Sequence, residues 1–493
     1  MDMQVVITEF GAIGDGEAKD TASLQRAINA CAADGGGTVI VPRGRFRIGT
    51  VYLQSYVSLV LEAGAILEAS TERSDYDRLQ LYRNTPNPAA YEGVLCAIGA
   101  RGVSISGKGR IEGQDQSFWI AKERERLRDR SEDTAIAYWA KEWRPMLLLL
   151  EDCSDVLIEG ITISQSPIYA GWLIDCSNVR ITGVTVNNDV EGPNTDGFHL
   201  SSCRNVRISD CDFRTGDDAI AIDANGTRAS NGITVTNCAF HTSVNCFRIY
   251  TGLDPWIKER IYTRISQIAI SNCTVSEASG FINVTAEDGE ISDIVVTGAS
   301  LNMEYEGVPI FMMTNRGQIR NVQMSHLIAS ANGVCTIVGQ PEDQIDQIQL
   351  ADMNFTITPR KKKYGLGIPA DMIGYAHHHF GPYNLYLRHV DSIEFNRIQV
   401  RWTEHLLPES WSLLHAEHVR HIVLDRIQGA KCGADPSMPV VSLQQVKEAE
   451  ITRMRVAEPA AVFIRVSEEP AERTCLRLAD NDLRLVDIEV KRD

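Results

Sequence analysis

A nine-residue pattern of alternating apolar and polar positions recurs along most of the chain. Well-formed copies begin at residues 155 (DVLIEGITI), 178 (NVRITGVTV) and 205 (NVRISDCDF), and later copies begin at residues 232, 267, 293, 321, 347, 392, 421 and 448. Such alternation is typical of strands that bury one face. A unit this small cannot bury its apolar face alone, so successive copies must stack. The pattern therefore predicts an all-β fold, a parallel β-helix.

The start of the chain predicts a helical cap. Residues 20–37 (DTASLQRAINACAADGGG) have the pattern of one helix, with Asp20 or Thr21 as its cap and three glycines at its end. Its apolar positions are Leu24, Ile28 and Cys31. A helix in this place would cover the first exposed strand edge of a solenoid.

The repeats predict a single β-helix domain over residues 1–493. Residues 1–70 would form the N-terminal cap and first coils, and residues 431–493 the degenerate final coils. Two stretches break the pattern, residues 115–143 and residues 356–381, and we expect both to be loop excursions from the solenoid.

Both excursions carry candidate side chains. The first is charged and helix-prone, which predicts either a solvated helical decoration or a wall of a substrate cleft. Its aromatic candidates are Trp119, Trp139 and Trp143. The second contains a basic run at 360–363 and three histidines at 377–379. Adjacent histidines cannot all point the same way on a strand, so these residues do not predict a metal site.

Residues 194–218 (NTDGFHLSSCRNVRISDCDFRTGDD) contain three aspartates in two polar, glycine-containing motifs. Asp196 and Asp218 are 22 residues apart, about one coil, and coils rise by about one strand spacing, ~4.8 Å. Asp196, Asp217 and Asp218 should therefore stand on neighbouring coils and shift one another's pKa values. Such crowding suits acid–base catalysis better than it suits stability. The alternative is that these aspartates are ordinary turn residues.

Composition excludes several classes of function. The chain of 493 residues has a formal net charge of -17, which argues against nucleic acid and anionic membrane surfaces as partners. We find no apolar run long enough to span a membrane and no secretory leader in MDMQVVITEF, so we expect a cytoplasmic protein. The twelve cysteines contain no CxxC pair and predict reduced core residues, with Cys211, Cys238 and Cys273 stacked as a ladder. The sequence indicates no cofactor, and it does not indicate the oligomeric state.

Several segments resemble the pectin-degrading β-helix proteins, and most closely glycoside hydrolase family 28, the polygalacturonase-like family. They include EFGAIGDGEAKDTASLQRAINAC, VYLQSYVSLVLEAGAIL, SISGKGRIEGQDQSFW and Arg144-Pro145, together with NTDG at 194–197 and GDD at 216–218. The resemblance covers roughly residues 5–430. It implies a right-handed β-helix and an inverting glycosidase in which Asp217 is the general acid while Asp196 and Asp218 hold and activate water. Inverting sites usually separate their two carboxyl groups by ~6.5–9.5 Å.

Two family motifs are altered. Where polygalacturonases carry Gly-His-Gly, this chain has SVNCFRIYTG, which places Asn245 at the histidine position. Where they carry Arg-Ile-Lys, this chain has GFINVTAEDG, with Ile282 and Val284 at the positions of the two cations. An apolar side chain cannot replace an arginine–carboxylate clamp. Either the substrate sugar lacks a carboxylate or another residue supplies the cation, and the candidates are Arg248, Lys258 and Arg260. Arg248 is equally interpretable as a structural partner of the aspartates.

Other side chains have two interpretations each. Asn194 either braces its turn or hydrogen-bonds to substrate. The rings of Trp172, Tyr250 and Trp256 either stack on sugars or pack at coil edges. On a strand, His199 faces away from Asp196, which predicts a core histidine or one that supports the site from behind. The resemblance implies that Tyr364, Lys362 or a nearby histidine touches substrate.

Three functions fit these observations. The first is an inverting glycoside hydrolase that trims the ends of pectin-related or other plant-derived oligosaccharides. The second is a polysaccharide lyase or epimerase on the same fold, which would need a basic proton abstractor and often calcium. The third is a non-catalytic carbohydrate-binding β-helix. The sequence gives neither the sugar nor the linkage.

Overall fold

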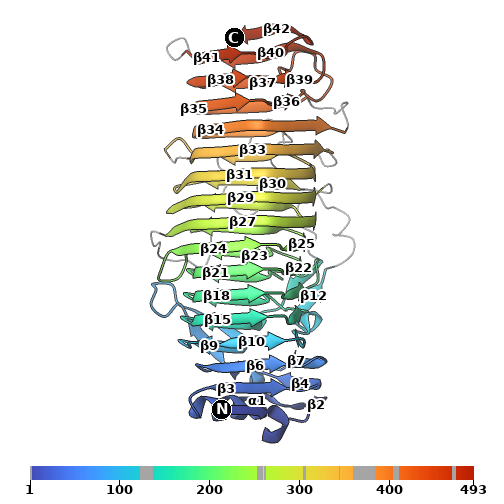
Figure 1. The fold of residues 1–493 in the computed structure, drawn as a ribbon, viewed down its shortest axis with the longest axis vertical. Coiled ribbons are helices and arrows are strands. Elements are labelled where there is room, and N and C mark those ends of the chain that lie inside the picture. Colours follow the sequence, from blue (N-terminus) through green and yellow to red (C-terminus); the bar gives the residue numbers. More distant parts are fainter. Residues whose placement is uncertain are drawn as a thin grey trace. The chain divides into compact units, whose positions relative to one another are not determined.

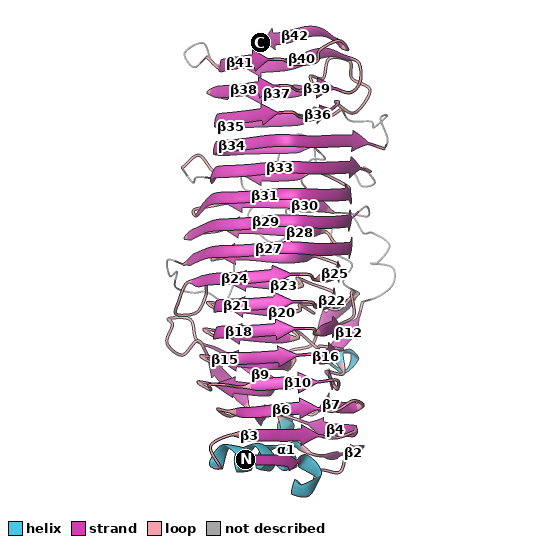
Figure 2. Ribbon diagram, in the orientation of Figure 1, coloured by secondary structure: helices cyan, strands magenta, loops and turns pink. Residues whose placement is uncertain are grey.

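The computed structural model describes residues 3–122, 137–252, 259, 263–303, 307–342, 345–358, 384–403, 410–468 and 473–493. Most of these residues form strands, and the class is a right-handed parallel β-helix, as the repeats and the family resemblance predicted (Figure 2). The chain divides into two compact units. The first contains the described residues up to Arg248 together with Glu259, and the second contains the others from Ile249 onward. The single domain over residues 1–493 remains a prediction.

In the first unit the strands stack in three columns of parallel pairs (Figure 1). The first column is β1 (Met3–Val6), β3 (Gly37–Val41), β6 (Val57–Leu61), β10 (Ser104–Gly107), β15 (Ser154–Glu159), β18 (Ser177–Thr182), β21 (Arg204–Ser209) and β24 (Ser230–Thr236). The second is β2 (Asp15–Lys19), β4 (Gly44–Ile48), β7 (Ala65–Ala69), β11 (Arg110–Glu112), β16 (Thr162–Ser164), β19 (Thr185–Asn187), β22 (Asp212–Thr215) and β25 (Ala239–Thr242). The third is β5 (Val51–Tyr52), β9 (Ala89–Ile98), β14 (Met146–Glu151), β17 (Gly171–Ile174), β20 (Phe198–Ser201), β23 (Ile220–Asp223) and the start of β26 (Asn245–Thr251).

The second unit has longer strands in the same parallel arrangement. One column is β27 (Arg264–Glu277), β29 (Glu290–Met303), β31 (Gln318–Ala331), β33 (Ile345–Ile357), β34 (Leu385–Trp402), β35 (Leu414–Asp425), β38 (Glu448–Thr452) and β41 (Cys475–Ala479). The other strands are β28 (Gly280–Ala286), β30 (Val308–Thr314), β32 (Cys335–Val338), β36 (Gln428–Gly429), β37 (Val441–Gln444), β39 (Arg455–Val456), β40 (Ala460–Ser467) and β42 (Val486–Arg492).

The repeats occupy the strands that they predicted. In β15, β18 and β21 the apolar positions align in register, with Val156 beside Val179 and Val179 beside Val206, and all three are buried. The first residue of each of these three copies adopts a left-handed conformation, with φ of 56° at Asp155, 54° at Asn178 and 53° at Asn205. Side chains of Asp and Asn tolerate that conformation better than most residues.

These first residues also bond to one another from coil to coil. Asn178 Nδ2 donates to Asp155 Oδ1 at 3.0 Å, and Asn205 Nδ2 donates to Asn178 Oδ1 at 3.2 Å. The bend that begins each of these three repeats is therefore held by side-chain hydrogen bonds between coils as well as by the backbone.

The predicted cysteine ladder is present in the first unit, where Cys211 and Cys238 are buried on adjacent coils. Cys273, in the second unit, is buried beside Ala299. All twelve cysteines are free thiols, and of these only Cys475 is exposed.

The predicted cap is the helix α1 (Thr21–Ala33), whose buried side chains include Leu24, Ile28 and Cys31. Asp20 occupies the N-cap position but does not cap the helix. Its carboxylate instead accepts the backbone N–H groups of Ile13 and Gly14, at 2.8 and 3.1 Å. Among the described residues, no helix is long and apolar enough to span a membrane.

The helical prediction for residues 115–143 is wrong at both described ends of that excursion. The short 3-10 helix η3 (Asp115–Phe118) leads into β12 (Trp119–Ala121), which pairs in antiparallel fashion with β13 (Tyr138–Ala140). This hairpin forms because its inner face packs Trp119 on Tyr138, with ring centroids 5.2 Å apart. The charged centre of the excursion and most of residues 356–381 lie outside the described residues.

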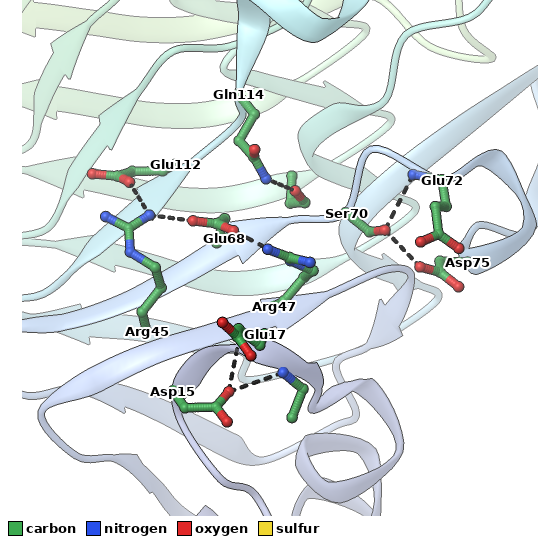
Figure 3. Close-up of polar contacts among 12 residues, drawn as sticks. Asp15, Glu17, Arg45, Arg47, Glu68, Ser70, Glu72, Asp75, Glu112 and Gln114 are labelled. Atoms are coloured by element: carbon green, nitrogen blue, oxygen red, sulfur yellow. Dashed lines mark hydrogen bonds and ion pairs between the residues drawn. The ribbon is translucent and has the colours of Figure 1, made fainter.

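Stacked carboxylates in the first coils are paired with arginines (Figure 3). Glu68 of β7 and Glu112 of β11 lie in register, and each is 6% exposed. Arg45 bridges the two carboxylates, and Arg47 Nε lies 3.3 Å from Glu68. Two more short elements are present here, the 3-10 helices η1 (Ile7–Phe10) and η2 (Arg73–Asp75), and β8 (Arg78–Leu81) pairs with β9 in antiparallel fashion.

The side-chain ladder predicts a stability difference between two substitutions at Asn178. We expect Asn178→Ala to destabilise the protein by about 1–2 kcal/mol, because it loses two hydrogen bonds and places alanine in a left-handed conformation. Asn178→Gly loses the same bonds without that conformational cost, so its midpoint of thermal unfolding should lie between those of Asn178→Ala and the unaltered protein. Equal midpoints for the two variants would show that the backbone conformation carries no cost.

Candidate active site

Backbone hydrogen bonds between successive coils bring the three aspartates together. Asp196 precedes β20, while Asp217 and Asp218 precede β23, the next strand of the same column. The Gly197 N–H donates to the Asp218 carbonyl at 3.0 Å, which sets Asp196 beside Asp218. One carboxylate oxygen from each of the three residues lies within 4.8 Å of the other two. The closest oxygens are therefore nearer than the separation expected for an inverting pair, while the catalytic roles remain predictions.

The two motifs are also tied to each other by a buried threonine. Thr195 Oγ1 accepts the Gly216 N–H at 2.9 Å and donates to the Asp189 carbonyl at 3.0 Å. A Cβ atom at Gly216 would lie only 2.5 Å from Thr195 Oγ1, and one at Gly197 would lie 2.2 Å from the Ala219 carbonyl oxygen. Both glycines are therefore required by the close approach of neighbouring coils.

The three carboxyl groups have different hydrogen-bond partners. Asp217 Oδ1 accepts the Asp218 N–H at 2.9 Å, and its Oδ2 lies 3.4 Å from Asn194 Nδ2. Asp218 Oδ1 accepts Asn245 Nδ2 at 2.7 Å. Asp196 is 4% exposed, and its Oδ1 has no hydrogen-bond partner among the described residues.

These surroundings raise the pKa of all three groups. Burial is the main cause for Asp196, whose pKa lies well above its usual value, and the charges of Asp217 and Asp218 add to it. Burial and then the charge of Asp218 raise the pKa of Asp217 to about 7. The pKa of Asp218 is also raised by burial, but Arg248 and the Asn245 amide oppose the shift. Near neutral pH Asp217 is therefore partly protonated and can donate a proton.

Arg248 is buried with the aspartates. Its side chain is 3% exposed, and its positive charge lowers the pKa of both Asp217 and Asp218. The Ala219 N–H donates to the Asn245 carbonyl at 2.8 Å, so the start of β26 forms the next coil of this column. This burial favours the interpretation of Arg248 as a partner of the aspartates over that of a clamp for substrate.

His199 lies behind the cluster in a polar pair that the sequence did not reveal. Its Nε2 is 2.7 Å from Asp223 Oδ2, which also accepts Ser201 Oγ at 2.7 Å. The His199 ring packs against Tyr169, with centroids 4.8 Å apart, and its charge lowers the pKa of Asp218. The arrangement is that of a histidine supporting the site. Asp223 could have been found from the register, which places it opposite Ser201.

Two of the aromatic candidates for sugar stacking are buried. Trp172 is 5% exposed, its ring is packed by Tyr82, Tyr91 and Tyr169, and its Nε1 donates to Ser201 Oγ at 2.9 Å. Packing therefore accounts for Trp172 and leaves no ring face for a sugar. Tyr250, in the second unit, is 6% exposed. The candidates Trp256, Lys258, Arg260, Lys362, Tyr364 and His377 to His379 lie outside the described residues.

The hairpin β12–β13 packs beside the segment that leads into the cluster. The Ala137 N–H donates to the Glu191 carbonyl at 2.8 Å, and Trp119 Nε1 donates to the Pro167 carbonyl at 2.9 Å. Trp119 is buried, whereas Trp139 is 53% exposed, with Lys122 Nζ 4.2 Å from its ring centroid. These contacts support the interpretation of the excursion as a wall beside the site, with Trp139 as its exposed aromatic.

Fold and cluster together define a right-handed parallel β-helix with an acidic site on one column of strands. Residues 31–253 match the family described as Glycosyl hydrolases family 28, which confirms the polygalacturonase-like resemblance for this part of the chain.

Curated relatives carry related names. The chain is 30% identical to a probable polygalacturonase of Vitis vinifera, over 44% of this chain and 43% of that protein. It is 23% identical to an exopolygalacturonase of Zea mays, over 62% of this chain and 68% of that protein. It is 25% identical to an exo-poly-alpha-D-galacturonosidase of Dickeya chrysanthemi, over 43% of this chain and 41% of that protein. The chain thus spans about half the length of the first relatives that it matches, 43% and 54%.

Solved structures share the fold. A family 28 exopolygalacturonase of Yersinia enterocolitica gives a TM-score of 0.66 at 17% identity, over 86% of this chain and 79% of that one. The tailspike protein of the E. coli bacteriophage HK620, in complex with a pentasaccharide, gives a TM-score of 0.57 at 11% identity, over 99% of this chain and 80% of that one. At these identities the likeness concerns the fold alone.

The raised pKa of Asp217 predicts a change in how stability depends on pH. In the folded protein this pKa is about 7, above the ordinary value of 3.8, so the stability that the protonated carboxyl provides is complete below about pH 4 and is lost as the pH rises through 7. Asp217→Asn cannot ionise. We therefore expect it to be more stable than the unaltered protein at pH 8 by about 1–3 kcal/mol, with a flatter profile between pH 4 and 8.

Thermal unfolding measured across this pH range checks the expectation. Asp212→Asn, at an exposed carboxylate on β22, is the matched control and should leave the profile unchanged. Parallel profiles for Asp217→Asn and the unaltered protein would contradict the assignment of a raised pKa.

Proposed function

We propose that this protein is a glycoside hydrolase that removes sugars from the ends of pectin-related oligosaccharides with inversion of the anomeric carbon. The observation that carries the proposal is the three-aspartate cluster, in which Asp217 has a pKa of about 7 while Asp218 is paired with an amide donor and lies near a cation. Asp217 is assigned as the general acid, and Asp196 with Asp218 as the groups that hold and activate water. The family match and the names of the relatives support this assignment.

The roles follow from protonation. A general acid must hold a proton at the working pH, and a pKa near 7 allows Asp217 to hold one and release it to the leaving oxygen. A group that activates water must be ionised, and Arg248 and Asn245 favour the ionised form of Asp218. Two groups with separated proton affinities in one cluster are the arrangement that glycoside hydrolysis uses.

The substrate class follows from the altered motifs. Ile282 and Val284, which replace the two cations of the family motif, are each 0% exposed in the core of the second unit. Arg248 is 3% exposed and belongs to the aspartate cluster. None of these three positions offers an exposed cation for a uronate carboxylate, and on these described residues we propose a neutral sugar at the reacting position. The alternative is a cation from Lys258 or Arg260, which lie outside the described residues. We further propose that the enzyme acts in the cytoplasm on imported oligomers.

A product assay tests the reaction. The panel contains galacturonides, rhamnogalacturonan fragments and neutral arabino-, xylo- and galacto-oligosaccharides, and proton NMR in the first minutes identifies the anomer released. We expect a neutral sugar to be released with inversion and Asp217→Asn to lose at least about a thousandfold in kcat. The kcat/KM profile should fall as the pH rises through about 7, where Asp217 ionises.

Other products would point elsewhere. Retention of configuration would contradict the proposed inversion and would indicate that one aspartate acts as a nucleophile. An unsaturated product absorbing in the ultraviolet, lost with a chelator, would indicate a lyase. Release of galacturonate would overturn the neutral-sugar proposal, and sugar binding without turnover would indicate a binding protein.

The Asn245 amide predicts a shift of the acidic limb of the pH profile. Asn245→Ala removes the 2.7 Å donor to Asp218, so the pKa of Asp218 should rise and the acidic limb of kcat/KM should move up by about one pH unit. Asn245→His restores a donor at the position where the family carries histidine, and it should move the limb less. An unchanged limb in Asn245→Ala would exclude Asp218 as the group that must be ionised.

A further inference from the structure

Arg144 holds together three segments around the cluster. It lies between the hairpin strand β13 and β14, and its side chain is partly buried. Its Nη1 donates to the carbonyls of Pro193 and Pro167, at 2.7 and 3.2 Å, and its Nη2 donates to Asn194 Oδ1 at 3.0 Å. One planar guanidinium can serve three acceptors in this way because its donors point in fixed directions.

These contacts determine which way the Asn194 amide faces. The two ends of a carboxamide have nearly the same shape, and their orientation is set by the groups they meet. A guanidinium can only donate, so the Asn194 oxygen must face Arg144. The Nδ2 atom then faces Asp217 Oδ2, 3.4 Å away. Arg144 thereby fixes the Asn194 amide, and that amide in turn is a donor to Asp217, the carboxyl that we assign as the general acid. We call this pair of contacts the relay.

Arg144 also supports a backbone conformation that is costly by itself. Asn194 has a φ of 56°, in the left-handed region, and it is exposed. Such a conformation persists where surrounding contacts fix it. The bond from Arg144 to the Pro193 carbonyl fixes the residue before Asn194, and the Thr195 hydroxyl bond to the Asp189 carbonyl fixes the residue after it. Asp196 follows directly in the same turn.

We propose that Arg144 is a positioning residue for the general acid, acting through Asn194 rather than on the substrate. This inference rests on the proposed role of Asp217. Arg144 also lies close enough to the carboxylates for the charges of Asp196 and Asp217 to favour its charged form, against the effect of burial, which lowers its pKa. A lysine at this position keeps the charge but cannot serve three acceptors at once.

The loss of the relay has a defined consequence. Without a fixed donor from Asn194, the pKa of Asp217 rises, because that hydrogen bond lowers it at present. The alkaline limb of kcat/KM then moves to higher pH. At the same time kcat falls, because the acid is less precisely placed, by about tenfold or more. KM changes little, because Arg144 does not bind the substrate.

A double-mutant cycle tests the proposal with Arg144→Lys, Asn194→Ala and the combined variant. We expect Arg144→Lys to lower kcat about tenfold in the unaltered protein and by less than about twofold in the Asn194→Ala background. The alkaline limb should move by the same amount in all three variants. Arg26→Lys is the matched control, because Arg26 also donates to a carbonyl and a side-chain oxygen, those of Phe10 and Ser23 at 2.6 and 3.0 Å, and it lies on the cap helix. It should leave kcat and the pH profile unchanged.

Additive effects, with the same loss in both backgrounds, would overturn the relay, and so would an unmoved alkaline limb in Arg144→Lys. A raised KM with an unchanged kcat would place Arg144 on the substrate instead.

A second measurement needs no substrate. Each variant is compared with the same variant carrying Asp217→Asn, and the pH at which their difference in unfolding temperature levels off reports the pKa of Asp217. The relay requires this pH to rise in Arg144→Lys and in Asn194→Ala alike, and an unchanged value refutes it. If Asp217→Asn retains full activity while this pH still rises, the proposed function fails but the relay stands.

Discussion

The parallel backbone ladder between successive coils is the constraint on which the site depends. The bonds from the Gly197 N–H to the Asp218 carbonyl and from the Ala219 N–H to the Asn245 carbonyl fix three coils in register at 3.0 and 2.8 Å. Neighbouring strands cannot move apart without breaking these bonds, so their side chains stay about one strand spacing apart, ~4.8 Å. Carboxyl groups placed at matching positions are therefore held close together whatever their mutual repulsion costs. The scaffold supplies the rigidity that keeps such an arrangement from relaxing.

Carboxylates on neighbouring coils have different surroundings in the first coils and in the aspartate cluster. In the first coils, Glu68 and Glu112 are each served by an arginine, with Arg45 between them. Each charge there has a partner, which is how buried charges are normally accommodated. In the aspartate cluster, Asp196 Oδ1 is buried with no hydrogen-bond partner among the described residues. Burial without a partner favours the protonated form of Asp196 and raises its pKa well above the usual value. The two groups of carboxylates thus differ in whether their charges are neutralised by neighbouring arginines.

Local patterns in the sequence were enough to predict the coils, the cap helix and the meeting of the three aspartates. The repeat defines the strands directly, and NTDG and GDD lie one coil apart in that repeat. Contacts made by chain segments far apart in sequence were not predictable in the same way. Arg144 reaches Pro167, Pro193 and Asn194 across 23 to 50 residues, and the choice of partner depends on how the hairpin packs.

Burial was also hard to judge from composition. Trp172 was a candidate for stacking on a sugar because it is an aromatic residue close in sequence to the aspartates. In the structure, Tyr82, Tyr91 and Tyr169 pack around its ring. The local propensity of the charged excursion at 115–143 favours a helix, which was one of its two predicted interpretations. At its described ends the chain forms paired strands instead, with Trp119 packed on Tyr138.

The replacement of a histidine by Asn245 alters the electrostatics of the cluster in a consistent direction. The Asn245 amide donates a hydrogen bond to Asp218 but does not titrate, so it cannot take up or release a proton as a histidine can. Arg248 compensates by placing a permanent positive charge beside Asp217 and Asp218, while its 3% exposure withholds that charge from any ligand outside. Among the described residues, the groups beside Asp217 and Asp218 are the amides of Asn194 and Asn245, with the Arg144 guanidinium bonded to Asn194. Negative charge in such a cluster can stabilise the positive charge that develops on a sugar ring during glycosidic cleavage. The proposal of a neutral sugar rests instead on three other positions, because Arg248 is buried with the aspartates and Ile282 and Val284 are apolar.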